Sequence, residues 1–108
     1  MKKDQRIPSV DDVRKRYGHP LSTLDIKNEK SYCVLGAFLL SWRGRTCDYR
    51  FPTVDDACSV LQVAGIRPTP AMVKVMRRII AKNDSRKFDQ AWAELDKLVG
   101  LLKREGQN

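Results

Sequence analysis

The sequence predicts an all-α fold, a compact single domain of about five helices over residues 1–108. Apolar residues recur at helical spacing in several segments. Helix-start signals precede three of these segments, and most connections between them are short. A further segment, 30–43, is apolar on nearly every side, as expected of a helix that others surround. We therefore expect this helix at the centre of the domain, with the chain ends at 1–8 and 105–108 frayed.

Start and stop signals separate the predicted helices. In chain order the helices are expected at 10–17, at 30–43, from a cap at Thr53 to Gly65, from a cap at Thr69 to about Lys82, and from a break at Asn83-Asp84-Ser85 to Gly106. Ser9 begins a capping arrangement. Thr69 followed by Pro70 is a clear helix start, because proline suits the first helical position. The stretches 18–29 and 44–52 are expected to be loops.

The later helices each place their apolar residues on one face, which predicts the core. This face is expected to consist of Val54, Ala57, Cys58, Leu61 and Ala64, then Met72, Val73, Met76, Ile79 and Ile80, then Phe88, Ala91, Trp92, Leu95, Leu98, Val99 and Leu102. In the central helix, Gly36 lowers the intrinsic helix propensity by about 1 kcal/mol relative to alanine. Such a glycine indicates that a neighbouring helix approaches closely.

The composition excludes several classes of protein. The chain is 42% hydrophobic and 31% charged, a balance typical of a globular domain. No apolar segment follows the charged residues 1–6, so no secretory signal is expected. The longest apolar run, 32–40, is about half as long as a bilayer span and is expected to be a core segment. We therefore expect a cytoplasmic protein that does not associate with a membrane.

Cysteine and histidine residues are few and scattered. The three cysteines lie at 33, 47 and 58 without a CxxC pair, which favours reduced thiols in a cytosol over a disulfide framework. A zinc site would need His19, the only histidine, together with irregularly spaced cysteines. No metal site and no cofactor are therefore expected.

Positive charge is concentrated in the segment 66–87. This segment holds seven basic residues and one acidic residue, a net charge of +6 out of +8 for the chain. The seven are Arg67, Lys74, Arg77, Arg78, Lys82, Arg86 and Lys87. Lys74, Arg78 and Lys82 are four residues apart, so with Arg77 they are expected to line one helix face opposite the apolar stripe.

Three interpretations of this basic segment are open. Lys and Arg side chains that share a face can neutralise the phosphates of a nucleic acid. The same face can instead bind an acidic protein. It can also be a solvated helix face that keeps a small protein soluble. The fourth predicted helix is thus the candidate site for binding nucleic acid or an acidic partner.

The third and fourth predicted helices invite comparison with a helix-turn-helix. The connection from Gly65 to Pro70 is longer than the usual turn of about three to four residues. The residues Gly65, Arg67-Pro68-Thr69 and Val73 nevertheless resemble the amino-terminal DNA-binding region of KfrA-type plasmid proteins. This resemblance, which covers about a fifth of the chain, implies DNA binding.

A broader resemblance covers residues 31–99. The motif Tyr32-Cys33-Val34-Leu35-Gly36-Ala37, then Phe51-Pro52, then Asn83-Asp84 before Phe88, Ala91-Trp92 and Leu95, is similar to small uncharacterised helical proteins of bacteria and phages. Those proteins combine a CxxGA helix with a late Asn-Asp turn. The resemblance implies no activity, and it marks Cys33, Gly36, Ala37, Asn83 and Asp84 as the positions that define the family.

Two other features carry alternative interpretations. Cys33 lies near a predicted helix N-terminus, where a thiol can become a nucleophile, but a small buried core residue is the usual role of a free cysteine. Its base would have to be His19. Tyr49 and Phe51 alternate with arginines, a pattern that can stack on single-stranded bases but more often folds back onto the domain.

The sequence supports three hypotheses about function. The leading one is a non-enzymatic binding module that uses the basic helix face for nucleic acid or an acidic protein. The second is a structural or interaction protein that associates with itself through an apolar helix face. The third is a cysteine-dependent enzyme that uses Cys33 and His19.

Overall fold

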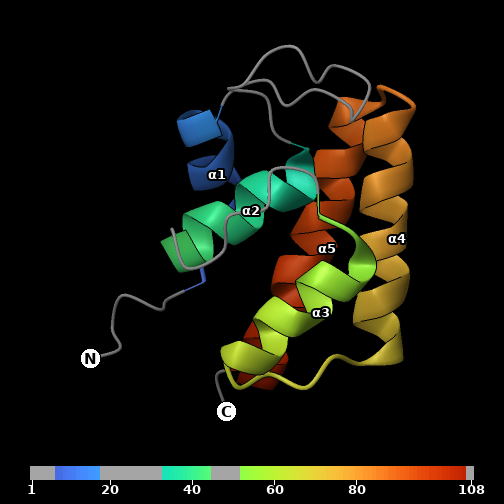
Figure 1. Cartoon of the computed structure of the whole chain (residues 1–108). Helices are drawn as coiled ribbons and strands as arrows, with labels where there is room; N and C mark the ends of the chain where they lie inside the picture. Colours follow the sequence, from blue (N-terminus) through green and yellow to red (C-terminus); the bar gives the residue numbers. More distant parts are fainter. Residues whose placement is uncertain (1–6, 18–32, 45–51, 107–108) are drawn as a thin grey trace.

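The computed structural model describes residues 7–17, 33–44 and 52–106, and these residues form five helices and no strand (Figure 1). The helices are α1 (Val10–Tyr17), α2 (Val34–Arg43), α3 (Val54–Val63), α4 (Pro70–Asp84) and α5 (Phe88–Gly106). The all-α prediction is confirmed. The predicted loop 18–29 lies outside the described residues, as does most of the predicted loop 44–52. No helix of the described part is long and apolar enough to cross a membrane.

The two longest helices, α4 and α5, form a hairpin that supports the rest of the fold (Figure 1). The Arg86 N–H donates to the Asn83 carbonyl, and the Lys87 N–H donates to the Lys82 carbonyl at 2.8 Å. These two bonds are those of a Schellman motif, which satisfies the last carbonyls of a helix. The motif puts Arg86 in the left-handed region at φ 62°, where glycine is usual. The hairpin therefore closes without a glycine.

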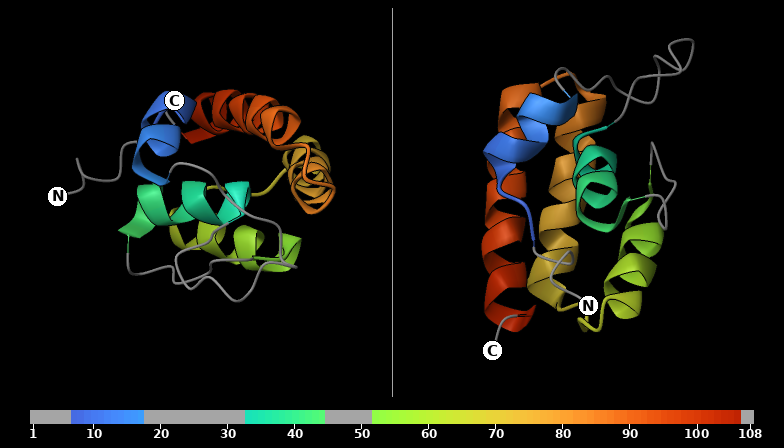
Figure 2. Two further views of the ribbon diagram at one scale, coloured as in Figure 1. Left: turned by 90° about the horizontal axis from the view of Figure 1, so that it is seen from above. Right: turned by 90° about the vertical axis from the view of Figure 1, so that its left-hand side faces the viewer.

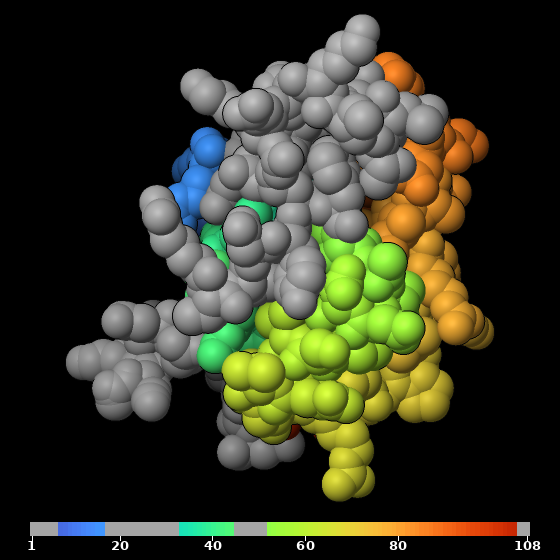
Figure 3. Space-filling view, viewed as in Figure 1, coloured from blue at the N-terminus to red at the C-terminus, as the bar shows by residue number. Residues whose placement is uncertain are grey.

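The other three helices pack against this hairpin. Helix α2 crosses it at a steep angle and contacts α1, α4 and α5, while α3 packs against α4 (Figure 2). Helix α1 contacts both α2 and α5. In the space-filling view, α4 forms an edge of the molecule beside α3 (Figure 3). One long helix face is thereby left at the surface.

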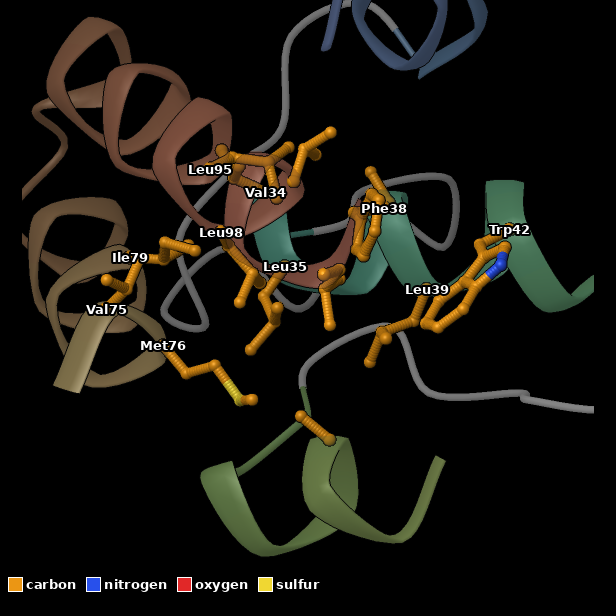
Figure 4. Packing of buried hydrophobic residues seen from close by; sticks show 14 of the residues in the cluster. Val34, Leu35, Phe38, Leu39, Trp42, Val75, Met76, Ile79, Leu95 and Leu98 are labelled. Atoms are coloured by element: carbon orange, nitrogen blue, oxygen red, sulfur yellow. The ribbon is translucent and has the colours of Figure 1, made fainter. Parts of the chain in front are cut away.

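The core is centred on α2, as predicted. Its residues Val34, Leu35, Gly36, Ala37, Phe38, Leu39 and Trp42 are all buried. The rings of Phe38 and Trp42 lie 5.6 Å apart between centroids, and Leu35 lies with Met76 and Leu98 of the hairpin (Figure 4). Ile7, within the segment predicted to fray, is also buried, and α5 continues through Gly106. A helix that is apolar on most sides thus fills the space between the others.

The prediction that α2 begins at residue 30 is wrong, because Cys33 is its N-cap. Cys33 has an extended backbone (φ −76°, ψ 163°), and its Sγ accepts a hydrogen bond from the Gly36 N–H at 3.2 Å. Serine, threonine, aspartate and asparagine are the usual caps, so sequence rules gave no reason to stop there. Residues 30–32 lie outside the described part.

Of the break predicted at Asn83-Asp84-Ser85, only the helix end at Ser85 is confirmed, and the prediction that this segment caps α5 is wrong. Helix α4 continues through Asp84, Ser85 is its C-cap, and Asn83 is buried inside the helix. The Asn83 Oδ1 accepts a hydrogen bond of 2.8 Å from the Val34 N–H. The first turn of a helix has N–H groups without intrahelical partners, and in α2 one of these groups donates to a side chain of α4. Asn83 therefore serves a distant helix end.

The remaining start signals are confirmed. Ser9 accepts a hydrogen bond from the Asp12 N–H before α1, and Thr53 forms a reciprocal capping box with Asp56 before α3. Thr69 accepts from the Met72 N–H, with proline in the first turn of α4. These caps lie within three residues of their partners, which is why the sequence revealed them.

Candidate nucleic-acid interface on helix α4

The seven predicted basic residues follow the length of α4. Arg67 is exposed in the connection before the helix, four of the residues lie on it, and Arg86 and Lys87 are exposed in the turn after it. A helix of 15 residues is about 22 Å long. The structure therefore distributes the seven charges along this helix and past both of its ends and does not gather them into one compact patch.

The outward face of α4 carries a shallow depression with a basic rim. It has a volume of about 490 Å³ and is lined by Pro70, Val73, Lys74, Arg77, Arg78 and Ala81. Lys74 and Arg77 are exposed and pair with no acidic residue in the described part of the chain. Pro70, Val73 and Ala81 are smaller than the basic side chains beside them, so a ligand has room to come close to the helix. We call this surface the α4 basic face.

Val73 belongs to this surface and not to the core stripe predicted for it. Val73 is half-buried at the rim of the depression, whereas Val75, which that prediction omitted, is buried. The core-facing side of α4 consists of Met72, Val75, Met76, Ile79 and Asn83. The predicted stripe was thus rotated slightly toward the solvent, because periodicity alone does not locate the edge of a helix's contact with its neighbours.

Arg78 differs from the other residues of the predicted row because it pairs with an acidic side chain. Its Nη1 lies 3.8 Å from Oε1 of Glu94 on α5, and its side chain is 42% exposed. Lys82, one turn further along, is half-buried. The predicted row of Lys74, Arg78 and Lys82 therefore turns from the outward face toward α5. Within the row, only Lys74 is both exposed and unpaired in the part of the chain that the structure describes.

Glu94 and Lys97 on α5 belong to the site and were missed from the sequence. The Lys97 Nζ donates to Glu94 Oε2 at 3.3 Å, and the Glu94 side chain is only 13% exposed. The spacing of Glu94 and Lys97 shows that they can pair along α5. Nothing local relates Glu94 to Arg78, since that contact exists only because the hairpin brings α4 and α5 together.

The environment of Cys33 is the reverse of that of an activated nucleophile. Burial raises the pKa of its thiol from 9.0 to about 11, against the lowering effect of the Gly36 N–H. Burial and the nearby Asp55 carboxylate also raise the pKa of Cys58. His19 and Cys47 lie outside the described residues, and no group of three potential metal ligands occurs among the described ones. Cys33 serves the fold as the cap of α2.

The predicted aromatic and basic loop is visible only at its edge. Arg43 lies over the Trp42 ring, with 5.8 Å between its Cζ and the ring centroid. Trp42 itself is buried. Tyr49 and Phe51 lie outside the described residues.

Comparison with protein-family models, with curated proteins and with solved structures gave no match. The resemblances to KfrA-type proteins and to small bacterial and phage proteins stay predictions.

Proposed function

We propose that this protein is a non-enzymatic binding module whose α4 basic face contacts the phosphates of duplex DNA. The observation that carries the proposal is the exposed, unpaired state of Lys74 and Arg77 beside a shallow depression. Charges that the fold has not used for ion pairs are available to release counterions from a polyanion. Arg67 at one end of the helix and Lys87 at the other extend this surface.

The shape of the surface favours a duplex over a single strand. Helix α4 lies at an edge of the molecule with its outward face uncovered by the other helices (Figure 2). An uncovered helix at an edge of the molecule fits the major groove of B-DNA, which is about 12 Å wide and admits one helix. Proteins that bind single strands use exposed aromatic side chains. Among the described residues, the only large hydrophobic side chain that is exposed is Val63.

The same physical argument favours DNA over duplex RNA. The major groove of A-form RNA is deep and too narrow for side chains to enter. Helix α4 would then contact only the outer phosphates of an RNA duplex. We therefore expect duplex RNA to bind more weakly than duplex DNA, with single strands weaker still.

Self-association has less support on the described surface. An apolar interface between two copies requires a contiguous apolar patch. Val63 is 78% exposed, but it stands alone among the large hydrophobic residues of the described part. An acidic protein is the other kind of partner whose charge would complement the basic face. Failure of the protein to bind nucleic acid would favour it.

Charge reversal on the basic face tests the proposal. The pair Lys74→Glu with Arg77→Glu is expected to weaken binding to a labelled DNA duplex by about 100-fold at low salt. The slope of log Kd against the logarithm of the salt concentration should decrease by the amount that about two phosphate contacts contribute. Fluorescence anisotropy over a series of salt concentrations measures both quantities. Because both side chains are exposed, we expect the free energy of unfolding to stay within about 0.5 kcal/mol of the wild type.

The matched control reverses two exposed basic residues of α1, which packs against α2 and α5 and lies across the molecule from α4 (Figure 1). Lys15→Glu with Arg16→Glu changes the net charge by the same amount and is expected to weaken binding only a few-fold. An equal loss in both pairs would mean that net charge matters and the α4 face does not. Failure of the wild type to bind any nucleic acid would overturn the proposal and turn attention to acidic proteins.

A further inference from the structure

Glu94 lies behind the α4 basic face and is poorly satisfied there. Its Oε1 is buried and accepts no hydrogen bond in the described part of the chain. The Nη1 of Arg78 lies 3.8 Å from this oxygen, too far for a hydrogen bond. The contact between Glu94 and Arg78 is therefore a loose ion pair.

Arg78 is shared between this ion pair and the binding surface. It lines the outward depression with Lys74 and Arg77, and 42% of its side chain is exposed. A partly exposed ion pair without hydrogen bonds contributes little stability. A phosphate at the depression would offer Arg78 a hydrogen-bonded partner, and arginine binds phosphate well because its planar donors match the phosphate oxygens.

Lys97 makes the release of Arg78 feasible. An isolated carboxylate with little exposure is unfavourable, because it loses water without gaining a partner. When Arg78 turns away, Glu94 keeps its 3.3 Å hydrogen bond from Lys97 on the next turn of its own helix. The carboxylate thus retains a cation in both arrangements of Arg78.

We propose that Glu94 is an internal competitor for the phosphate ligand of the α4 basic face. In the free protein its carboxylate occupies Arg78, and on binding Arg78 exchanges Glu94 for a phosphate while Lys97 stays on Glu94. Glu94 thereby lowers the affinity of the site for phosphate. This inference rests on the proposed function, and it assigns an affinity-setting role to a residue of α5.

Removing the charge of Glu94 tests the inference. Glu94→Gln is expected to tighten binding to the labelled duplex by about 5-fold. The slope of the salt dependence should stay the same, because Arg78 contacts a phosphate in the complex of either protein. The matched control is Asp96→Asn, which removes the same charge from an exposed position on the same helix. It is expected to tighten binding by less than about 2-fold, because solvent screens an exposed charge.

A double-mutant comparison identifies Arg78 as the group that is released. In an Arg78→Gln background, Glu94→Gln should have no larger effect than Asp96→Asn, since the competition no longer exists. Circular dichroism and urea unfolding verify that each variant is folded. If glutamine disturbs the α4–α5 contact, Glu94→Ala removes the carboxylate without placing a new polar group in a largely buried position.

The outcomes separate the inference from the proposed function. Binding by the wild type and loss with the Lys74 and Arg77 reversals support the function, whatever Glu94 does. The inference is overturned if Glu94→Gln and Glu94→Ala match Asp96→Asn or weaken binding, or if the gain persists without Arg78. Absence of binding by the wild type overturns both.

Discussion

Helices α2 and α4 use their polar groups in opposite ways. At the N-terminus of α2, the Val34 and Gly36 N–H groups are buried and are satisfied by Asn83 and Cys33. On the outward face of α4, Lys74 and Arg77 are exposed and have no acidic partner among the described residues. A buried polar group must be satisfied for the protein to fold, whereas an exposed cation is available to a ligand. Substitutions should therefore affect stability in the first region and binding in the second.

The largest effect on stability is expected at Asn83. Asn83→Ala would leave the buried Val34 N–H without its acceptor and should lower the free energy of unfolding by about 2 kcal/mol. Urea denaturation followed by circular dichroism measures this change. Gln90→Ala removes a similar amide from an exposed position on α5 and should change stability by less than about 0.5 kcal/mol. Equal effects would show that the α2 terminus has another acceptor available.

The second effect concerns the thiol that caps α2, and it appears as a dependence of stability on pH. The pKa of Cys33 is about 11 in the folded protein, above its ordinary value of 9.0. Below pH 9.0 both states keep the thiol protonated, and its contribution is fully present. As pH rises toward 11, the unfolded state loses the proton first and is favoured, so stability falls.

The expected loss from Cys33 is about 1.4 kcal/mol at about pH 10. Chemical denaturation at a series of pH values measures it. Cys33→Ser keeps an acceptor at the cap but does not titrate in this pH range. The stability of this variant should therefore not show the loss that the thiol causes in the wild type. Identical pH profiles for the two proteins would contradict the buried environment assigned to Cys33.

The smallest effect concerns two glycines, and it shows that substitution at a position with open space around it can still change stability. Gly65 is exposed after α3, but its φ of 84° lies in the left-handed region, and an added Cβ would meet no atom within 4 Å. Gly65→Ala should therefore lower stability by about 1 kcal/mol through backbone strain alone. Gly100 lies inside α5 with equally open space around it. Gly100→Ala should raise stability by about 0.5 to 1 kcal/mol, because alanine is the better helix former.

Thermal or urea unfolding of both alanine variants compares the two glycines directly. A change of the same sign at both positions would mean that backbone conformation does not distinguish them. The same hydrogen-bond pattern closes α3 at Gly65 and α4 at Arg86, where the φ is 62°. The glycine was recognisable in the sequence as a helix end, and the arginine was not.

The sequence alone predicted the helices, most of their caps and the central place of α2. These features depend on hydrogen bonds and apolar spacing within a few residues, as at Thr53 with Asp56 and at Thr69 with Met72. It also located the segment that carries most of the net charge. Local rules read such features directly, because the interacting groups are neighbours along the chain.

Only the tertiary structure decided which polar groups the fold uses. Asn83 looked like a helix break, yet it caps a helix end 49 residues away. Arg78 looked equivalent to Lys74, yet the α4–α5 hairpin places it beside Glu94. Both outcomes depend on the packing of distant helices, which satisfies a buried N–H in one case and pairs a cation in the other. The sequence therefore identified a basic helix, and the fold determined which of its charges are left for a partner.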